Sequence, residues 1–233
     1  MCGRFTLTRQ NRRELAHLLG VDEDDLRDYR PRYNIAPTDR HFIVTSKYER
    51  RTARAASWGL VNSWATDNSS ASQCINAKAE TLEERRAFRE AFLQRRCVIP
   101  ADGFYEWRGP KTQREPVWIH PPDRGLLLFA GLYESWQTKP GEWQRTFTII
   151  TTAANALLKA IHDRMPVILD EGAAEDWMNP RERNPLSLKR LLTPAPADLL
   201  LMQPASPLVN SVKNDGPELF EQGGSSNLQL RLI

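Results

Sequence analysis

Hydrophobic and polar positions recur along the chain in two periods, one typical of short helices and one of short strands. The helical period comes first, because Leu15, Leu18 and Leu19 fall on one face of a helix. Gly20 follows, and glycine is common just past a helix end because it adopts positive φ without strain. The pattern therefore predicts a helix over residues 11–19.

A second helix is predicted to begin at Thr81. Thr81 and Glu84 have the spacing of a capping box, in which each side chain bonds the backbone N–H of the other residue. Leu82, Phe88 and Phe92 then recur at helical spacing.

Three further helices are predicted in the last third of the chain. They cover residues 155–162, 171–178 and 185–192. Asn184 and Pro185 open the last of them as N-cap and first helical residue, where the missing N–H of proline costs no hydrogen bond.

Short runs of branched and aromatic residues, punctuated by glycine and proline, predict the strands. The predicted strands are residues 42–46, 52–58, 97–99, 103–107, 117–119, 126–133, 146–151 and 167–169. Residues 32–38 contain Pro37 and are expected to be irregular. Short loops between strands favour antiparallel pairing. We therefore expect an α+β fold of curved, mostly antiparallel sheets, barrel-like and flanked by helices.

One domain is expected over residues 1–222. No internal repeat and no Pro/Gly/Ser-rich linker divides this stretch, and its length suffices to bury a substantial core. Residues 223–233 open with two glycines and two serines and are expected to form a flexible tail.

The three cysteines suggest neither a disulfide framework nor a metal site. Cys2, Cys74 and Cys97 are scattered over 233 residues and lack the spacing of zinc ligands. No segment resembles a secretory signal, and none has the run of apolar residues that spans a bilayer. We expect a cytoplasmic, nucleoid-associated protein.

Positive charge is modest overall, at +3, but it is clustered. The clusters are Arg4, Arg9, Arg12 and Arg13 near the start and Arg85, Arg86, Arg89, Arg95 and Arg96 around one predicted helix. Such clusters form phosphate-binding faces, although a solvated helix face has the same pattern. Trp64 lies in a polar loop, where it either packs on the core or stacks on a nucleic-acid base.

Cys2 stands directly behind Met1. Removal of Met1 would leave an α-amine and a thiol on adjacent carbons, and this aminothiol condenses with an aldehyde to a Schiff base and then to a thiazolidine. The amine ordinarily titrates at about 7.7–8 and the thiol at about 8.5, so both are expected to be nucleophilic near neutral pH. Gly3 would let a substrate approach the backbone, and Arg4 would hold a phosphate. A small buried residue is the alternative interpretation of Cys2.

Asn76 and Glu106 are two further candidates. Asn76 precedes a predicted helix, where its side chain either caps the turn or bonds a ligand. Glu106 lies in a predicted strand among Phe104, Tyr105 and Trp107, and a partly desolvated carboxylate suits a general acid or base. The alternative for Glu106 is an ion pair with an arginine at a sheet edge.

His162 is the fourth candidate, at the end of a predicted helix that Pro166 stops. The negative end of a helix dipole favours the imidazolium form, so His162 would serve as a proton donor. A histidine that caps the last helical carbonyls is the alternative.

Seven separated motifs run through the chain in order. They are Met1-Cys2-Gly3-Arg4-Phe5, Arg32-Tyr33-Asn34-Ile35-Ala36-Pro37, Trp58-Gly59-Leu60, Asn76-Ala77-Lys78-Ala79-Glu80-Thr81, Ala101-Asp102-Gly103-Phe104-Tyr105-Glu106-Trp107, His162-Asp163-Arg164-Met165-Pro166 and Val212-Lys213-Asn214. Together they resemble the SRAP family of SOS-response-associated peptidases, or abasic-site-processing proteins. Lys78 and Met165 depart from the family, which more often has arginine at both positions, and lysine lacks the bidentate fork of arginine.

The resemblance implies a sensor of abasic sites in single-stranded DNA. Cys2 would lose Met1 by autocatalysis and trap the deoxyribose aldehyde as a thiazolidine crosslink. Glu106 would assist the cleavage and move protons, and Asn76 would position the Cys2 amine. Glu106 would also act in crosslink reversal, whereas His162 would open the sugar ring and support β-elimination of the 3′ phosphate, a lyase activity.

The resemblance also implies DNA contacts and partners. The candidate DNA-binding residues are Gly3, Arg4, Pro37, Trp64, Lys78, Arg85 and Arg164. The expected partners are single-stranded DNA with abasic sites and replication-fork proteins, with no membrane, for a monomeric protein. No metal and no cofactor is called for, because the aminothiol is the reagent.

Two other functions are alternatives to the abasic-site sensor. One is an amidohydrolase with an amino-terminal cysteine nucleophile, which would need an oxyanion hole and a compact substrate pocket. The other is a non-catalytic reader of modified or single-stranded DNA, with Cys2 as a structural residue.

Overall fold

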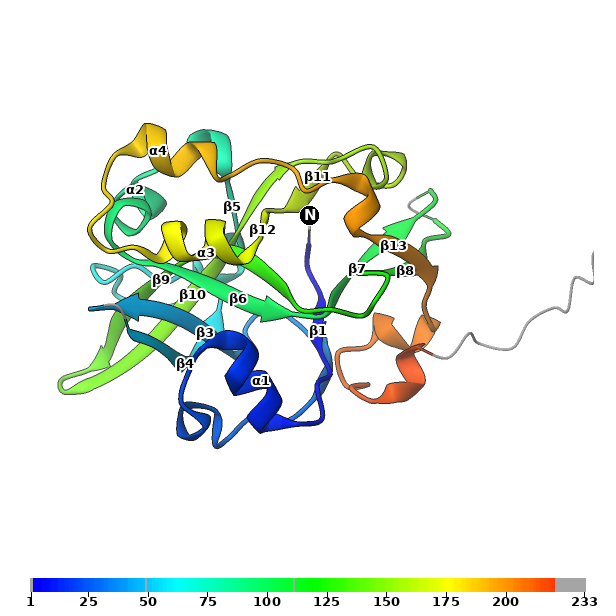
Figure 1. The fold of residues 1–233 in the computed structure, drawn as a ribbon, viewed down its shortest axis with the longest axis horizontal. Helices are drawn as coiled ribbons and strands as arrows, with labels where there is room; N and C mark the ends of the chain where they lie inside the picture. Colours follow the sequence, from blue (N-terminus) through cyan, green and yellow to red (C-terminus); the bar gives the residue numbers. More distant parts are fainter. Residues whose placement is uncertain (1, 49, 111, 221–233) are drawn as a thin grey trace, which may run out of the picture.

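Branched and aromatic residues build the strands of the protein, whose computed structural model describes residues 2–48, 50–110 and 112–220 (Figure 1). The strands are β1 (Phe5–Leu7), β2 (Arg32–Ile35), β3 (Arg40–Lys47), β4 (Arg50–Trp58), β5 (Asn76–Lys78), β6 (Arg96–Ala101), β7 (Gly103–Arg108), β8 (Glu115–His120), β9 (Leu127–Lys139), β10 (Glu142–Ala153), β11 (Arg164–Pro166), β12 (Ile168–Leu169) and β13 (Leu201–Pro204). The α-helices are α1 (Arg12–Leu19), α2 (Arg86–Gln94), α3 (Glu171–Met178) and α4 (Pro185–Arg190). Short 3-10 helices include η1 (Glu23–Leu26), η3 (Ala79–Thr81) and η4 (Leu158–Ala160).

Five strands close into a barrel. β10 pairs with β4, β4 with β3, β3 with β6, β6 with β9, and β9 pairs again with β10. All of these pairs are antiparallel except β10–β4. β5 and β11 extend the sheet from β10, and β12 extends it from β9. The expected α+β fold with a barrel-like, mostly antiparallel sheet is confirmed.

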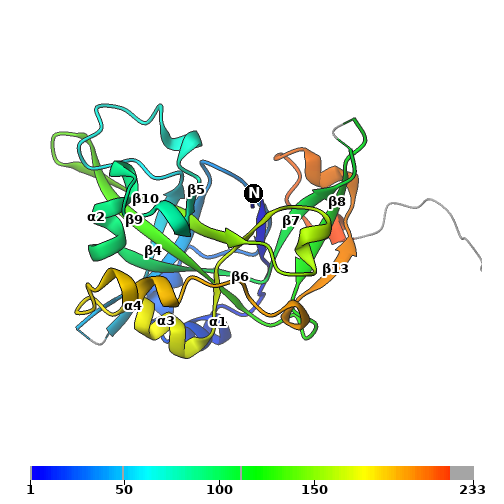
Figure 2. The same ribbon diagram turned by 90° about the horizontal axis from the view of Figure 1, so that it is seen from above.

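A second sheet lies beside the barrel, with the strand order β13-β8-β7-β1-β2. β1 lies between β7 and β2, and its Phe5 lies opposite Phe104 of β7 and Ile35 of β2. In Figure 2 the amino-terminal end of β1 lies between β5 and β7, where the barrel and the second sheet meet.

An aromatic cluster joins the two sheets. Phe5 packs edge-on against His41, Trp58 and Phe129, with ring centroids 4.9, 5.1 and 6.1 Å away. Trp58 in turn stacks on Phe147. Burial of five rings stabilises the position of β1, and therefore of the chain start, against the barrel.

Side-chain caps open three helices, and of these the sequence predicted the cap at Asn184. The Asn11 side chain accepts a hydrogen bond from the Glu14 N–H at the start of α1, and Gly20 ends the helix at φ 65°. Asp170 accepts from Ala173 at the start of α3. Asn184 caps α4, which ends at Arg190. Helices predicted over 11–19 and 171–178 are confirmed, and that over 185–192 is confirmed in a shorter form.

Two helix predictions are wrong. The helix expected from Thr81 begins at Arg86, because the Thr81 carbonyl accepts the N–H of Glu84 and of Arg85 in a turn that breaks the register. Residues 155–162 contain only the single turn η4. There the Asn155 side chain accepts from the Leu158 N–H at the start of this one turn, which ends with Ile161 as its C-cap.

The region of residues 32–38, expected to be irregular, contains the edge strand β2. Its outer edge is covered by the end of the described chain, because the Asp215 carboxylate accepts the N–H of Tyr33 and of Asn34. Such long-range cover leaves no local signal in the sequence. β13 was also not predicted; it pairs with β8 on the other edge of this sheet.

The tail expected over residues 223–233 lies outside the described residues. No helix among the described residues has the length and apolar character needed to cross a membrane.

Candidate active site at the amino terminus

Cys2 lies buried at the start of β1, with 0% of its side chain exposed. Its Sγ lies 3.7 Å from the carbonyl oxygen of Arg4. Burial, and then the negative charge of Glu106, raise the pKa of the Cys2 thiol. The thiol is therefore protonated at neutral pH in the chain that carries Met1. The expectation that it titrates near neutrality concerns the chain without Met1 and stays a prediction.

Asn76 lies beside Cys2. Its Nδ2 donates to the Cys2 carbonyl oxygen at 2.8 Å. β5 is held in place by parallel pairing with β10, where Ile149 lies opposite Asn76, and by Trp58, whose Nε1 donates to the Ile75 carbonyl. The Oδ1 of Asn76 is buried and has no hydrogen-bond partner among the described residues. Asn76 is a strand residue and caps no helix.

Glu106 lies on β7, which pairs with β1 on one side and β8 on the other. The Tyr105 N–H donates to the Arg4 carbonyl at 2.9 Å. Because β7 runs antiparallel to β1, the next residue, Glu106, lies beside the end of β1 that carries Cys2. Its side chain is buried, and its charge reaches the Cys2 thiol. The alternative that placed Glu106 on a sheet edge is wrong.

His162 follows η4 and is half-buried. Its Nδ1 accepts the backbone N–H of Arg164 at 2.9 Å, so the neutral ring carries its proton on Nε2. The Asp163 carboxylate lies 3.0 Å from the same Nδ1 and is a partner for the protonated ring. One 3-10 turn precedes His162, so the expected α-helix dipole is absent there.

Arg164 ties the His162 segment to the Asn76 segment. Its two terminal nitrogens pair with both carboxylate oxygens of Glu80 at 2.7 and 2.8 Å, and Nη2 also donates to the Thr151 carbonyl. Glu80 lies four residues after Asn76, and Arg164 lies two after His162. The ion pair thus bridges the two segments, and it lowers the pKa of Glu80.

Arg4 and Gly3 follow Cys2 and are half-buried. Arg4 Nη1 donates to Asn34 Oδ1 at 2.9 Å and to the Val209 carbonyl at 2.8 Å, and its guanidinium lies 6.0 Å from the Trp107 ring. Burial lowers the pKa of Arg4. Part of its hydrogen-bonding capacity is therefore used within the fold.

Lys78, Arg85 and Trp64 are exposed. The Trp64 ring is 55% exposed, and the Arg86 guanidinium lies 4.4 Å from its centroid. This decides between the two interpretations of Trp64, which does not pack in the core. Pro37 is half-buried in the turn between β2 and β3.

The arginine cluster around α2 does not form one phosphate-binding face. Arg85, Arg86 and Arg89 are exposed. Arg95 instead pairs with Glu134 and Glu90, and Arg96 turns inward. Arg96 donates to the carbonyls of Phe92, Trp177, Asn179 and Glu182 and so closes the ends of α2 and α3.

Three residues that support the site were not predicted. Asn34 accepts from Arg4 and donates to the Ser211 and Asn214 carbonyls, which joins β1 to the end of the described chain. Glu80 lies inside the motif that begins at Asn76, so its position was visible but its partner was not. Asp215 directly follows the last motif.

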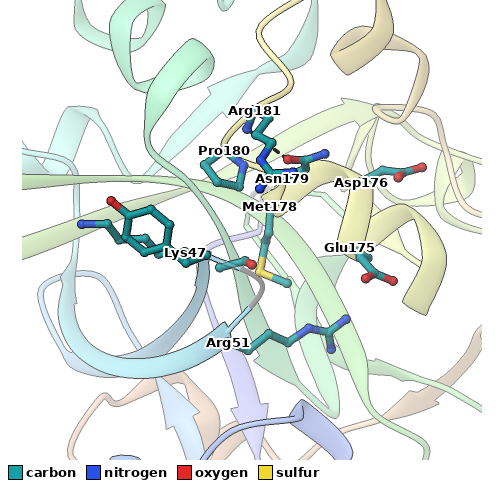
Figure 3. A pocket seen from close by; sticks show the side chains of 10 residues that line it. Lys47, Arg51, Glu175, Asp176, Met178, Asn179, Pro180 and Arg181 are labelled. Atoms are coloured by element: carbon teal, nitrogen blue, oxygen red, sulfur yellow. Dashed lines mark hydrogen bonds between the residues drawn. The ribbon is translucent and has the colours of Figure 1, made fainter.

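A recess of about 640 Å³ lies elsewhere, between the end of the β3–β4 hairpin and the end of α3 (Figure 3). None of the candidate site residues lines it. The cavity therefore adds nothing to the chemistry at Cys2.

The fold and the site define the class of the protein: a small α+β barrel that holds a buried amino-terminal cysteine between an amide and a carboxylate. The chain belongs to the SOS response associated peptidase (SRAP) family, whose sequence model matches residues 1–212. The SRAP family expected from the motifs is therefore confirmed.

Relatives support the same assignment. The chain is 42% identical to the abasic site processing protein YoqW of Bacillus subtilis, over 95% of this chain and 99% of YoqW. It is 31% identical to the abasic site processing protein YedK of Escherichia coli, over 95% and 99% of the two chains. A crystal structure of a protein from Bacteroides thetaiotaomicron superimposes with a TM-score of 0.83 at 26% identity, over 95% of this chain and all of that one.

Proposed function

We propose that the protein senses abasic sites in single-stranded DNA and traps them covalently through Cys2 after removal of Met1. The observation that carries the proposal is the convergence of Cys2, Asn76 and Glu106, which come from β1, β5 and β7. The names of the relatives, as abasic site processing proteins, supply the substrate class.

Removal of Met1 is the first step. Hydrolysis of the Met1–Cys2 peptide bond consumes one water, releases methionine and leaves the Cys2 α-amine. Glu106 is proposed to take a proton from the attacking water and return one to the leaving amine. The Asn76 Nδ2 bond to the Cys2 carbonyl keeps that residue in place while the bond breaks.

The new α-amine changes the electrostatics at the sulfur. An ammonium on the α-carbon of Cys2, next to the carbon that carries the thiol, opposes the effect of Glu106 and favours the thiolate. The Asn76 Oδ1, buried without a described partner, is proposed to accept a hydrogen bond from the new amine. Maturation is thus proposed to activate the thiol as well as to free the amine.

The crosslink forms in two balanced steps. The amine adds to the C1′ aldehyde of the open abasic sugar and loses one water, which gives the Schiff base. The thiolate then adds to the imine carbon, and the imine nitrogen takes up the proton to close the thiazolidine. His162, with its neutral ring protonated on Nε2, is proposed to donate a proton to the sugar ring oxygen and to support lyase chemistry, whereas Glu106 is proposed to act in crosslink reversal.

Nearby groups are proposed to hold the DNA strand. Lys78 and Arg85 are exposed and suited to phosphates, and Trp64 is exposed and suited to stacking on a base. Gly3, Arg4 and Pro37 would contact the strand near Cys2. Arg164 is proposed to act from its ion pair with Glu80, as a positioning residue.

A denaturing gel tests the proposal. The mature protein is incubated with single-stranded DNA that carries one abasic site, and then heated in detergent. A stable shifted band is expected. Complete absence of a band, with mass spectrometry showing that Met1 has been removed, would sink the proposal.

Variants of Cys2 identify the reacting group. Cys2→Ala is expected to abolish the stable band, and Cys2→Ser to give at most a labile adduct, because a hydroxyl closes a less stable ring. A Cys2→Ser crosslink as durable as that of the natural chain would rule out the thiazolidine. Reversible binding alone would favour the non-catalytic reader, and turnover of small amides would favour the amidohydrolase.

A further inference from the structure

A second polar recess lies at the end of the barrel away from Cys2. β3 and β4 contact Phe5, near Cys2, through His41 and Trp58. Their opposite ends, at Lys47 and Arg50, line the recess. Lys47 is six residues along β3 from His41, which corresponds to about 20 Å. The recess is thus separate from the candidate active site.

The recess has a volume of about 540 Å³, and cations dominate its wall. The lining residues are Thr45, Ser46, Lys47, Tyr48, Arg50, Thr52, Arg54, Gln94, Arg96, Tyr133, Arg145, Met178 and Pro180. Among the described residues that line the recess, five carry positive charge and none is a carboxylate. A concave surface of one charge concentrates the local potential and attracts counter-ions.

Three of the five cations have no carboxylate partner in the described part of the chain. Arg145 is half-buried, and its side chain forms neither a hydrogen bond nor an ion pair there. Lys47 lies against the ring of Tyr48, 5.1 Å from its centroid. Arg96 donates to backbone carbonyls alone, and burial lowers its pKa to about 10, so it stays charged at neutral pH.

The other two cations have carboxylate partners outside the recess. Arg50 pairs with Asp22 at 2.8 Å, and their side chains are 70% and 63% exposed. Arg54 pairs with Asp25 at 3.2 Å, and their side chains are 51% and 13% exposed. The exposed Arg50–Asp22 pair contributes little, so an anion in the recess can draw on Arg50.

The recess in Figure 3 adjoins the cationic one and holds two carboxylates. The two recesses share Ser46, Lys47, Tyr48, Met178 and Pro180. In Figure 3 the side chain of Lys47 extends to one side of Met178, whereas Glu175 and Asp176 lie on its other side. Neither of these carboxylates lines the cationic recess.

We propose that this recess binds a ligand through its phosphate groups, with Arg145 and Lys47 as the principal contacts. Guanidinium and ammonium groups bind phosphate oxygens through charge-assisted hydrogen bonds, and Thr45, Thr52 and Tyr133 add hydroxyl donors. The volume is in the range of ordinary small-molecule pockets. The phosphates belong either to a free nucleotide or to a nucleic-acid backbone, and the exposed ring of Tyr48 at the hairpin end suits a base of either.

The test uses the full chain with Cys2→Ala, so that no covalent reaction contributes. Inorganic pyrophosphate, ATP and a short undamaged oligonucleotide are titrated separately at low ionic strength by calorimetry. Arg145→Gln with Lys47→Gln is expected to lower the affinity for the bound probe by about tenfold or more. Arg13→Gln with Arg27→Gln removes the same charge from an exposed surface and is expected to change affinity by less than about twofold.

The probes distinguish the two sources of phosphate. Binding of pyrophosphate and ATP, lost in the recess variant, identifies a free phosphorylated ligand. Binding of the oligonucleotide, with affinity lost only in the recess variant, identifies a nucleic-acid backbone. No binding of any probe, or equal losses in the two double variants, overturns the proposal.

Two further measurements distinguish loss of phosphate binding from misfolding and from loss of the reaction at Cys2. Arg145→Lys keeps the charge and is expected to retain part of the affinity, which a folding defect would not allow. The recess variant with natural Cys2 is expected to crosslink abasic DNA at the normal rate when DNA is saturating. The experiments thereby test phosphate binding in the recess separately from the proposed crosslinking by Cys2.

Discussion

Asn76 is the side chain on which the geometry around Cys2 depends. Its amide nitrogen holds the Cys2 carbonyl, and its amide oxygen is buried without a described partner. A buried acceptor of this kind is costly unless a donor arrives, and the α-amine that the proposed removal of Met1 would create is such a donor.

Asn76→Ala is therefore expected to slow crosslinking by about tenfold to a hundredfold, because a small misplacement of reacting atoms has effects of this size. The rate is measured in single-turnover gels at saturating abasic DNA. Asn76→Asp is the matched control, since it keeps an acceptor but loses the donor to the carbonyl. Normal rates in Asn76→Ala would remove Asn76 from the site.

His41 makes stability depend on pH. It is buried, donates from Nε2 to the Pro100 carbonyl, and packs on Phe5. Burial lowers its pKa from about 6.5 to about 4, so the unfolded chain takes up a proton first as the pH falls. This contribution to stability is complete above pH 6.5 and is lost progressively toward pH 4, by about 3 kcal/mol.

Urea denaturation at several pH values checks this expectation. The difference in unfolding free energy between the natural chain and His41→Gln is expected to shrink as the pH falls from 6.5 to 4. Glutamine keeps a donor for the Pro100 carbonyl and does not titrate. A difference independent of pH would mean that His41 is not held neutral.

Between elements, the Glu80–Arg164 pair decides how β11 and the His162 turn sit against β5. The pair is bidentate, and Arg164 also binds the Thr151 carbonyl of β10. Glu80→Gln is expected to lower the crosslinking rate at saturating DNA about tenfold, with little change in affinity for undamaged DNA. The charge swap Glu80→Arg with Arg164→Glu is expected to restore part of the rate. A loss of affinity with an unchanged rate would instead make Arg164 a phosphate contact.

Strand contacts around the barrel leave no room at Gly131 of β9. A Cβ at this position would lie 2.8 Å from the Thr148 carbonyl oxygen and 2.1 Å from Ile99 Cδ1. Gly131→Ala is expected to lower the unfolding free energy by about 1–3 kcal/mol, because the backbone of β10 must shift. Gly172→Ala in α3, with its nearest neighbour at 3.6 Å, is expected to be neutral or stabilising by up to about 1 kcal/mol. Thermal unfolding of both variants measures the difference.

For the whole molecule, we expect the affinity for single-stranded DNA to depend on the salt concentration. Contacts to phosphates release counter-ions, so the affinity of the Cys2→Ala chain for single-stranded DNA should fall with salt at a log–log slope of about −0.7 per contact. Lys78→Gln with Arg85→Gln is expected to make the slope shallower by about 1.4. Fluorescence anisotropy over a salt series measures both slopes. Equal slopes would place the strand elsewhere.

The sequence by itself predicted local structure and the candidate residues. The caps at Asn11, Asp170 and Asn184 and the alternation in β3, β4 and β9 depend on neighbours in sequence, so their patterns predict the elements. The motifs around Cys2, Asn76, Glu106 and His162 likewise identified the family and the candidate residues before any contact was known.

Long-range contacts were decided by the tertiary structure. β2 owes its cover to Asp215, and the state of the Cys2 thiol depends on burial and on Glu106. Arg164 pairs with Glu80, which is 84 residues away in the sequence. Arg96 belongs to an arginine cluster in the sequence, but its side chain is buried and donates to carbonyls at the ends of α2 and α3. Residue types and their spacing predict the caps, the strands and the motifs, because local hydrogen bonds depend on neighbours in the sequence. Burial, charge pairing and the cationic recess arise only when distant segments meet, so no local pattern encodes them.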